Sequence, residues 1–329
     1  MKQPTLVVLG LALSLMHAVA QTRDEMSNGL RSDLVWSWRV PSNNPECTLV
    51  PASLFIGSDT LGILPSGGAI FSNFNNIINL PSLKVAGPLP DNWYIETQFR
   101  VDWSQVPDTS FVQAGLVIFV NADNYFQALV TRNPNTTTVS GSTHREVPGW
   151  FEWACVGTQA WQPDNDYIGL RIVHEPNPGG DYGNAIRLYV RHSGTNGQWV
   201  QFNGGAETIE AGAFLQFAEG NCPWMRWRNF YNEITELINT DGVRIGVYAD
   251  RAGATLNVPF YFDYFETNIP VQTRVSGDVD GNNCVDDADL LQVLFNFGAS
   301  DCADADLNTD GIVDDADLLT VLFNFGTGC

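Results

Sequence analysis

The sequence predicts a mainly β protein that ends in a small α-helical unit, and two of its features support this prediction. Alternating apolar and polar runs recur through most of the 329 residues, separated by Gly, Asn, Pro and Asp clusters. Such runs indicate antiparallel strands joined by turns, as in a β-sandwich or jelly roll. The last 53 residues contain one unit written twice. A short apolar run at the N-terminus precedes both parts.

The first twenty residues have the composition of a secretory signal peptide. Lys2 precedes an apolar run at residues 6–16, and the small residues Ala18 and Ala20 place the expected cleavage before Gln21. The run is too short to cross a bilayer, and no other apolar stretch is long enough. We therefore expect an exported protein without a membrane span, located outside the cell or at the cell surface.

Residues 31–270 form the predicted sandwich domain, after an N-terminal segment at residues 21–30. This length is enough for one large core. The expected strands are residues 94–101, 114–120, 125–131, 167–173, 185–192, 243–249 and 260–266. One helix is expected at residues 230–238. A short polar segment at residues 271–276 is the expected linker to the C-terminal unit, residues 277–329.

The duplicated unit reads VDDADLLQVLFNFG at residues 285–298 and VDDADLLTVLFNFG at residues 313–326, identical at 13 of 14 positions. Each copy overlaps the end of a twelve-residue loop. A hard cation such as Ca²⁺ takes about six to eight oxygens at about 2.4 Å, and a loop of this length can wrap around it. Oxygen-bearing side chains stand at positions 1, 3, 5 and 12 of the two loops: Asp278, Asp280, Asn282 and Asp289, then Asp306, Asn308, Asp310 and Asp317.

Position 6 of such a loop needs a sharp backbone turn. Gly311 stands there in the second loop, and Asn283 stands there in the first. Asn tolerates the left-handed region best after glycine. Position 12 is Asp in both loops, where the general EF-hand pattern has Glu.

The C-terminal unit is strongly acidic. It holds twelve Asp, and no Lys or Arg follows Arg274. These residues carry 12 of the 21 net negative charges, a density that repels itself without a counterion. We therefore expect two bound calcium ions, with a solvated acidic surface that happens to repeat as the alternative. The acidic balance also argues against a nucleic-acid partner.

Two such loops, each followed by one helix, resemble a type I dockerin over residues 277–329. The resemblance implies one calcium ion per loop, antiparallel packing of the two loop-helix units and docking onto a cohesin domain. By position it implies these metal ligands: Asp278, Asp280, Asn282, the carbonyl of Cys284 and Asp289, then Asp306, Asn308, Asp310, the carbonyl of Ile312 and Asp317. Asp286 and Asp314, at position 9, would act through water.

The partner is less well defined than the metal. Dockerins often carry Ser or Thr at loop positions 10 and 11, whereas this chain has Asp287, Ala288, Asp315 and Ala316, so the specificity does not transfer. Six of the eight residues 290–297 are large and apolar, more than a module of this size can bury. The surplus indicates docking, either to another protein, such as one with a cohesin-like domain, or to the chain's own sandwich.

Export makes the six cysteines candidate disulfide partners. Cys47, Cys155 and Cys222 precede the C-terminal unit, and Cys284, Cys302 and Cys329 lie within it. An odd number on each side means either one free thiol per domain or one bridge between the domains. The dockerin resemblance places the first loop near the C-terminus and so implies a Cys284–Cys329 pair. Cys302 is then the candidate for a bridge to the sandwich.

Five phrases of the sandwich region resemble the concanavalin-like module at the C-terminus of β-xylosidases. They are QAGLVIFVNADNYFQALV at residues 113–130, YIGLRIV at 167–173, RLYVRHSGTNGQWVQFNG at 187–204, VRIGVYAD at 243–250 and FYFDYFETN at 260–268. The resemblance covers about residues 31–270. It implies a fold more than an activity.

No catalytic motif stands out in the sandwich region. A glycoside hydrolase needs two carboxyl groups facing one cleft, and the Glu-x-Asp-x-x-Glu pattern of concanavalin-like β-glucanases is absent. Glu152, between Phe151 and Trp153, is the acid to test first, although an edge carboxylate among packing aromatics is the favoured interpretation. The sequence therefore favours a non-catalytic protein, and a glycoside hydrolase if it is an enzyme.

Tryptophans are the stronger functional lead, because all ten precede the C-terminal unit. Exposed Trp rings can stack on the apolar faces of sugars. The candidate carbohydrate ligands are Trp150, Trp153, Trp161, Trp224 and Trp227. For each of them, burial in a large core is the alternative.

The main hypothesis is a secreted, non-catalytic sandwich that binds carbohydrate and is attached by a calcium-loaded dockerin-like module to a polysaccharide-degrading assembly outside the cell. A secreted glycoside hydrolase with a dockerin is the second hypothesis. The third is a structural protein whose calcium-stabilised tail caps the sandwich or self-associates.

Overall fold

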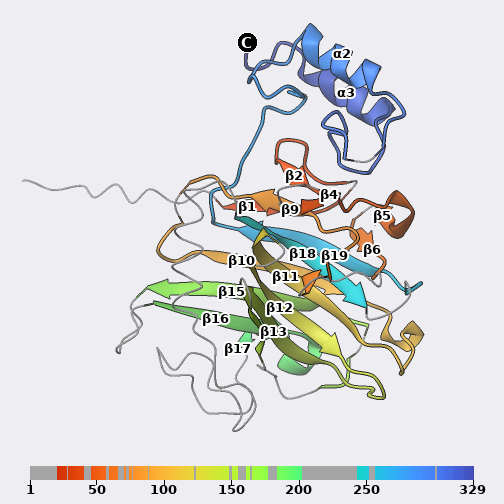
Figure 1. Ribbon diagram of the computed structural model, residues 1–329. Coiled ribbons are helices and arrows are strands. Elements are labelled where there is room, and N and C mark those ends of the chain that lie inside the picture. The colour runs from red at the N-terminus through yellow and green to blue at the C-terminus, as the bar shows by residue number, and fades with distance from the viewer. Residues whose placement is uncertain are drawn as a thin grey trace, which may run out of the picture.

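The computed structural model describes residues 21–329, with gaps at 28, 41–45, 57–58, 66–69, 72–73, 76, 88, 122–123, 148–149, 155–160, 164, 177–183, 202–242, 252–255 and 301. The described residues form a β-sandwich with a small two-helix unit at one end (Figure 1). This confirms the predicted fold class. The expected signal peptide and the expected helix at residues 230–238 lie outside the described residues.

The first sheet has eight strands in the order β17-β16-β15-β10-β19-β6-β5, with β1 also paired to β19. All of its pairings are antiparallel. The strands are β1 (Thr22–Asp24), β5 (Leu54–Ile56), β6 (Leu61–Ile63), β10 (Tyr94–Arg100), β15 (Ile168–Pro176), β16 (Asn184–Arg191), β17 (Val200–Gln201) and β19 (Phe260–Thr267).

The second sheet has seven strands in the order β14-β13-β12-β11-β18-β9-β2, again antiparallel throughout. Its strands are β2 (Trp36–Ser37), β9 (Ser82–Lys84), β11 (Val112–Asn121), β12 (Asn124–Arg132), β13 (Ser140–Val147), β14 (Trp150–Ala154) and β18 (Arg244–Arg251). Two further short hairpins pair β3 (Arg39–Val40) with β4 (Glu46–Cys47), and β7 (Ile70–Phe71) with β8 (Phe74–Asn75). Single 3-10 turns are η1 (Pro51–Ser53), η2 (Trp103–Gln105) and η3 (Ser193–Thr195).

The seven expected strands agree with the observed ones to within three residues at each end. They were predictable because an apolar side chain stands at every second position on the face that meets the opposite sheet. Several short strands lie outside the expected ranges, and so does the eight-residue β13, whose sequence SGSTHREV is mostly polar. Such a strand has no apolar period to detect, and its place in the sheet follows from its pairing with β12.

The main core lies between the two sheets. Phe99 of β10 is fully buried, with its ring 6.1 Å from that of Phe260 and 5.5 Å from that of Phe262 on β19. β11 is buried on both faces: Leu116 and Ile118 belong to the main core, whereas Val117 and Phe119 belong to a second cluster on the outer face of the sheet. Burial on both faces explains the nearly continuous apolar run of this strand.

The two segments that flank the predicted sandwich domain are hydrogen-bonded to it. β1 lies within the N-terminal segment and pairs with β19. In the expected linker, the Gln272 backbone N–H donates to the carbonyl of Lys84, and the Arg274 N–H donates to the carbonyl of Asp33. The C-terminal unit then follows with helices α2 (Asp287–Phe295) and α3 (Asp315–Asn324). None of the helices among the described residues is long and apolar enough to cross a membrane.

We expect Phe99→Ala to lower the free energy of unfolding by about 3–5 kcal/mol, because the substitution leaves a cavity between the two sheets. Denaturant titration followed by tryptophan fluorescence measures this change. Phe55→Ala is the matched control, since Phe55 is 43% exposed at the edge of the first sheet. An equal loss of stability in both variants would contradict the assignment of Phe99 to the core.

Candidate functional site

The two acidic loops each lead directly into a helix. Asp286 is the N-cap of α2, where its side chain accepts a hydrogen bond from the Ala288 N–H, and the Asp289 side chain accepts one from the Asp286 N–H. Asp314 and Asp317 make the same reciprocal pair at the start of α3. Each capping box satisfies N–H groups at the helix start, so the two carboxylates hold each loop against its helix.

In the first loop, backbone N–H groups turn the carboxylates inward. Asp278 is almost fully buried and accepts hydrogen bonds from Gly281, Asn282 and Asn283 at 2.8–3.2 Å. Asp289 accepts from the N–H of Val279 at 2.7 Å with its other oxygen. Potential ligand oxygens of Asp278, Asp280 and Asp289 lie within 4.8 Å of one another. That spacing suits several oxygens around one hard cation.

The second loop repeats the backbone hydrogen bonds of the first. Asp306 accepts hydrogen bonds from the N–H groups of Asp310 and Gly311, at 3.1 and 2.8 Å. Asp317 accepts one from the N–H of Leu307 at 2.6 Å. The amide of Asn308 donates to Asp310 at 3.0 Å, which brings the oxygen-bearing side chains of positions 3 and 5 together.

The structure confirms the expected backbone turn at position 6. Asn283 has φ +67° and Gly311 has φ +98°, both in the left-handed region. The two positions differ in their surroundings. A Cβ at Gly311 would lie 2.6 Å from Cγ of Pro51 in the sandwich. Glycine is therefore needed in the second loop for close packing as well as for its backbone angle, and this accounts for the difference between the two copies.

Burial disfavours the charged form of the carboxylates in the second loop. Burial is the main cause that raises the pKa of Asp306 to about 7, and the neighbouring Asp317 and Asp310 raise it further. Burial also raises the pKa of Asp317. A bound cation would offset this cost, so the carboxylates of the second loop fit calcium in their chemistry.

Arg274 is the last basic residue of the chain and lies at the junction between the sandwich and both loops. Its Nε donates to the carbonyl of Ser32 at 3.0 Å, and its Nη2 donates to the carbonyl of Leu307 at 3.4 Å. Burial lowers its pKa, while Asp304, Asp278 and other loop carboxylates favour its charged form. Arg274 therefore offsets part of the negative charge where the two domains meet.

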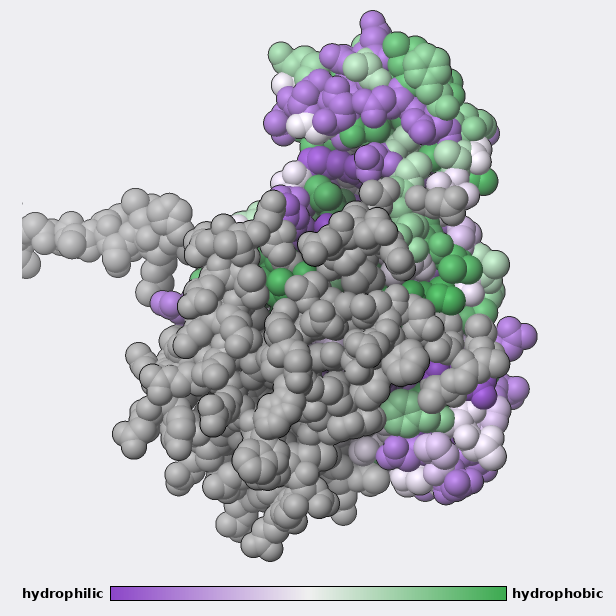
Figure 2. All heavy atoms as spheres, viewed as in Figure 1, coloured by the Kyte–Doolittle hydropathy of each residue, from purple (hydrophilic) through white to green (hydrophobic). Residues whose placement is uncertain are grey.

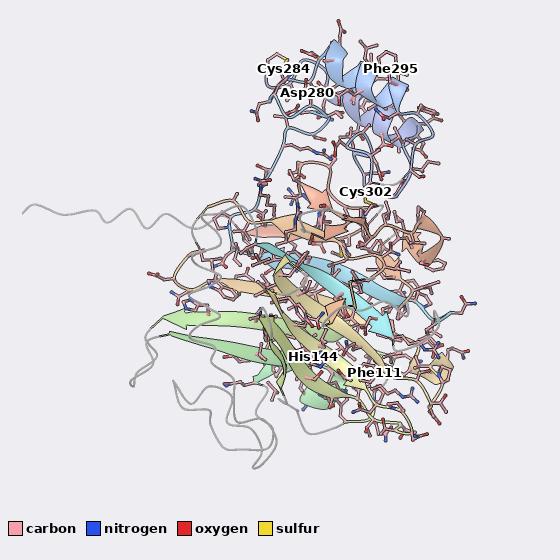
Figure 3. The ribbon with its side chains drawn as sticks, viewed as in Figure 1. Phe111, His144, Asp280, Cys284, Phe295 and Cys302 are labelled. Carbon is pink, nitrogen blue, oxygen red and sulfur yellow. A yellow bond between two sulfur atoms is a disulfide. The ribbon has the colours of Figure 1, made fainter. Side chains whose placement is uncertain are left out.

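The second loop is packed directly against the sandwich. Its backbone carbonyls at Asn308 and Thr309 accept hydrogen bonds from the Leu30 N–H and the Trp38 indole, both at 3.2 Å. A disulfide joins Cys47 in β4 to Cys302, just before the loop. Figure 3 shows Cys302 at this junction and Cys284 on the outer side of the unit. The predicted bridge from Cys302 to the larger domain is confirmed.

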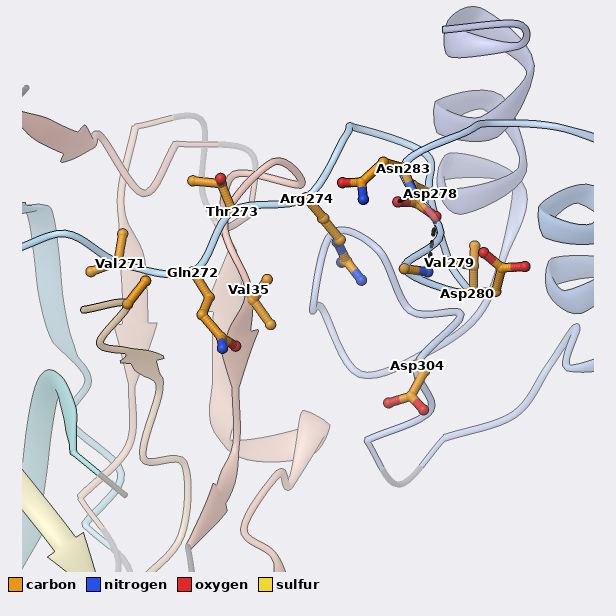
Figure 4. Close-up of a pocket in the computed structure, with 12 residues that line it drawn as sticks. Val35, Val271, Gln272, Thr273, Arg274, Asp278, Val279, Asp280, Asn283 and Asp304 are labelled. Atoms are coloured by element: carbon orange, nitrogen blue, oxygen red, sulfur yellow. Dashed lines mark hydrogen bonds between the residues drawn. The ribbon is translucent and has the colours of Figure 1, made fainter. Parts of the chain in front are cut away.

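The first loop has different surroundings. A cavity of about 520 Å³ separates it from the edge of the sandwich, lined by Gln272, Arg274, Asp278, Asp280 and Asp304 among others (Figure 4). A second disulfide joins Cys284 of this loop to Cys329 at the C-terminus, as the dockerin resemblance implied. The first loop is thus held by its own domain, and the second loop is held by the sandwich.

The helices expose a repeated set of large apolar side chains. Val293 and Val321 are buried between the two units, but Phe295 and Phe323 are 82% and 83% exposed. The exposed side chains occur as four pairs separated by 28 residues: Leu291 and Leu319, Leu294 and Leu322, Phe295 and Phe323, and Phe297 and Phe325. Figure 2 shows hydrophobic residues on the surface of the C-terminal unit. The described part of the sandwich does not cover these side chains, although the second loop lies against it.

The candidates in the sandwich are less fully defined. The backbones of Trp150, Glu152 and Trp153 lie in β14 at the edge of the second sheet, but their side chains are outside the described residues, as are Trp224, Trp227, Cys155 and Cys222. Trp161 is partly exposed and stacks on His192, with ring centroids 4.3 Å apart. The assignment of these residues to a carbohydrate site stays a prediction.

The sequence did not predict which sandwich residues contact the C-terminal unit. Trp38 lies 271 residues before Thr309 and Cys47 lies 255 residues before Cys302, and Pro51 is similarly distant in sequence from Gly311. No spacing rule links positions this far apart. The odd number of cysteines in each part was the one signal that pointed to such a contact.

No model of a known protein family matches the sequence, and a search of curated proteins finds no match. Among solved structures, a xylan β-1,4-xylosidase from Bacillus halodurans C-125 is 15% identical with a TM-score of 0.46, over 74% of this chain and 38% of that one. A Bacteroides ovatus xyloglucan GH43B is 13% identical with a TM-score of 0.45, over 80% and 40%. The Emp47p carbohydrate recognition domain is 11% identical with a TM-score of 0.39, over 77% and 96%.

The chain spans about two fifths of the length of the Bacillus halodurans and Bacteroides ovatus structures. No activity or ligand is therefore transferred from these proteins to this chain.

Peptide mapping under non-reducing conditions is expected to recover Cys47 linked to Cys302 and Cys284 linked to Cys329. In a Cys47→Ser and Cys302→Ser double variant, the free energy of unfolding should be lower by about 2–4 kcal/mol, because this bridge no longer constrains the unfolded chain. Cys284→Ser with Cys329→Ser is the comparison, since it opens a loop of only 45 residues within the C-terminal unit. Recovery of Cys302 with a different partner would contradict this architecture.

Proposed function

We propose that this protein is secreted, and that its C-terminal unit binds two calcium ions and attaches the β-sandwich to a partner outside the cell. The proposal rests on two loops rich in oxygen ligands, the first with oxygens of Asp278, Asp280 and Asp289 within 4.8 Å of one another, and on four repeated pairs of exposed apolar side chains. The oxygen-bearing side chains would hold the metal ions, and the exposed apolar pairs would form a surface for interaction with another protein. The two disulfides agree with an oxidising compartment.

The calcium ions would be held by the side chains and carbonyls that the loop positions define. In the first loop these are Asp278, Asp280, Asn282, the Cys284 carbonyl and Asp289, with Asp286 through water. In the second they are Asp306, Asn308, Asp310, the Ile312 carbonyl and Asp317, with Asp314 through water. Calcium would neutralise the negative charge of these carboxylates.

The exposed apolar side chains support attachment to another protein rather than docking onto the chain's own sandwich. The contact with the sandwich is made by the second loop, through backbone carbonyls and a disulfide. It leaves Phe295 and Phe323 more than four fifths exposed. We propose a cohesin-like domain of a polysaccharide-degrading assembly as the partner. The attached sandwich then acts as a non-catalytic, carbohydrate-binding domain.

Calorimetric titration of the full-length, metal-free protein with calcium is expected to show two binding sites. Asp278→Ala and Asp306→Ala should each weaken one of them by at least about tenfold, since removal of a ligand costs more than the loss of an outer partner. Asp287→Ala and Asp315→Ala are matched controls, because these Asp residues are exposed at position 10 of the loops. A chain that takes up no calcium would contradict the proposal.

A Phe295→Ala and Phe323→Ala double variant should lose binding to its partner by about 30-fold or more, as expected for exposed aromatic anchors of an interface. Capture from the surface fraction of the producing organism, with and without a calcium chelator, measures this loss. Phe55→Ala serves as the control, because it removes an exposed phenylalanine from the sandwich. Capture that survives both the double substitution and the chelator would exclude this surface as the attachment site.

A further inference from the structure

The two acidic loops carry equal sets of side chains in unequal surroundings. Positions 1, 3, 5 and 12 of each loop hold three carboxylates and one amide. At positions 5 and 6 of the first loop, Asn282 and Asn283 are exposed. At the same positions of the second loop, Asp310 is partly buried and Gly311 is buried. A difference in calcium binding between the loops would therefore come from their surroundings rather than from the composition of the ligand set.

The sandwich holds the backbone of the second loop next to its ligand side chains. The carbonyl of Asn308, at position 3, accepts a hydrogen bond from the Leu30 N–H at 3.2 Å. The carbonyl of Thr309, at position 4, accepts one from the Trp38 indole, also at 3.2 Å. Leu30 and Trp38 are 4% and 2% exposed, so both donors belong to the interior of the protein. Two successive peptide groups of the loop are thus fixed to the larger domain.

Two further contacts hold the second loop from outside the C-terminal unit. Nη2 of Arg274, in the linker, donates to the carbonyl of Leu307 at position 2, over 3.4 Å. Pro51 packs against Gly311 at position 6, where a Cβ would lie 2.6 Å from the proline Cγ. Positions 2, 3, 4 and 6 of the second loop therefore contact residues that do not belong to the C-terminal unit.

The equivalent positions of the first loop face open space. Val279, Asp280 and Gly281, at positions 2, 3 and 4, line the cavity of about 520 Å³ between this loop and the sandwich (Figure 4). A Cβ added to Gly281 would meet no atom within 4 Å. The first loop is therefore free of the sandwich where the second loop is held by it.

These contacts act on the loop conformation that calcium needs. Carboxylates that are brought together repel one another, and without a cation this repulsion favours a more open loop. Opening of the second loop would move the carbonyls of Asn308 and Thr309 away from their buried donors, and unpaired buried donors cost free energy. The contact therefore favours the closed loop. A bound cation favours the contact in turn, because coupling between two binding equilibria is reciprocal.

We propose that Leu30, Trp38 and Pro51 are positioning residues for the second calcium site. Calcium in the second loop and the contact between the two domains stabilise each other, whereas the first loop binds calcium independently of the sandwich. The inference rests on the proposed calcium binding and adds a link between the metal and the junction of the two domains. One of the two ions would then control how firmly the domains are held together.

An exchange of residues between the loops tests this coupling. Gly311→Asn gives the second loop the residue that the first loop carries at position 6, where Asn283 has φ +67°. The added side chain would collide with Pro51, so we expect the affinity of the second site to fall about fivefold or more. Pro51→Ala removes the colliding Cγ, so combining it with Gly311→Asn should recover most of the affinity. Calorimetric titration of the full-length, metal-free protein in an Asp278→Ala background, where the first site is disabled, measures these affinities.

Two tryptophans provide a matched pair for the hydrogen bond to the loop. Trp38→Phe removes the indole donor to Thr309, and we expect the second site to bind calcium about three- to tenfold more weakly. Trp36→Phe removes an indole donor that bonds to Asp24 within the sandwich at 2.8 Å, and should leave both sites unchanged. In an Asp306→Ala background, which keeps only the first site, neither substitution should change the calcium affinity.

Hydrogen exchange of the Leu30 N–H reports on the contact itself, because this amide donates to the second loop. Calcium should slow its exchange about fivefold or more in the wild type and in Asp278→Ala, since the contact opens less often when the loop is occupied. In Asp306→Ala, calcium should leave the rate unchanged. Amide exchange followed by NMR measures these rates.

The outcomes separate this inference from the proposed function. A wild type that takes up no calcium would overturn both. Two sites in the wild type, with a second site that is unchanged by Gly311→Asn and Trp38→Phe, would overturn the coupling alone. Equal weakening of both sites would also overturn it, as would failure of Pro51→Ala to restore the affinity of Gly311→Asn. If Trp38→Phe does not fold, the comparison of Gly311→Asn with its Pro51→Ala double variant still decides.

Discussion

The contact between the second acidic loop and the sandwich determines how the two parts of this protein are joined. The loop presents backbone carbonyls to Leu30 and Trp38, and the Cys47–Cys302 disulfide closes the chain beside it. Carbonyls can accept these hydrogen bonds while the carboxylates remain turned into the loop. The C-terminal unit can therefore contact the sandwich while its loop carboxylates stay available for a metal ion. The helices remain exposed.

Two nearly identical loop-helix sequences thus make different contacts. The second loop packs on the sandwich and needs glycine at position 6, where a side chain would collide with Pro51. The first loop borders a cavity, tolerates Asn283 at the same position and is closed by the Cys284–Cys329 bridge. The apolar helix positions stay equivalent, since Phe295 and Phe323 are exposed to almost the same extent. Duplication has preserved the outward surface, while the inward contacts have diverged.

Both sheets of the sandwich bury polar side chains on their outer faces: Glu96 and Glu266 on the first sheet, and Gln113, Gln127, Tyr248 and Asp250 on the second. Side chains between the sheets are almost all apolar, whereas the outer face of the second sheet holds both a small apolar cluster and a buried polar row. Polar groups in such a place reduce stability unless something pairs with them. The Tyr248 hydroxyl donates to the Asp250 carboxylate, and this hydrogen bond offsets part of the cost of burying both groups.

The sequence by itself determined the local features whose signals are short-range. Alternating side chains predicted the strands to within three residues, and the loop spacing predicted the left-handed turns at Asn283 and Gly311. Strand β13 escaped detection because its polar residues carry no apolar period. Only the tertiary structure decided that the second loop meets Trp38 and Pro51, that the linker lies against the sandwich, and that Gln113, Gln127 and Asp250 share one face. Those outcomes depend on strand register and on contacts between residues far apart in the chain, which no local pattern encodes.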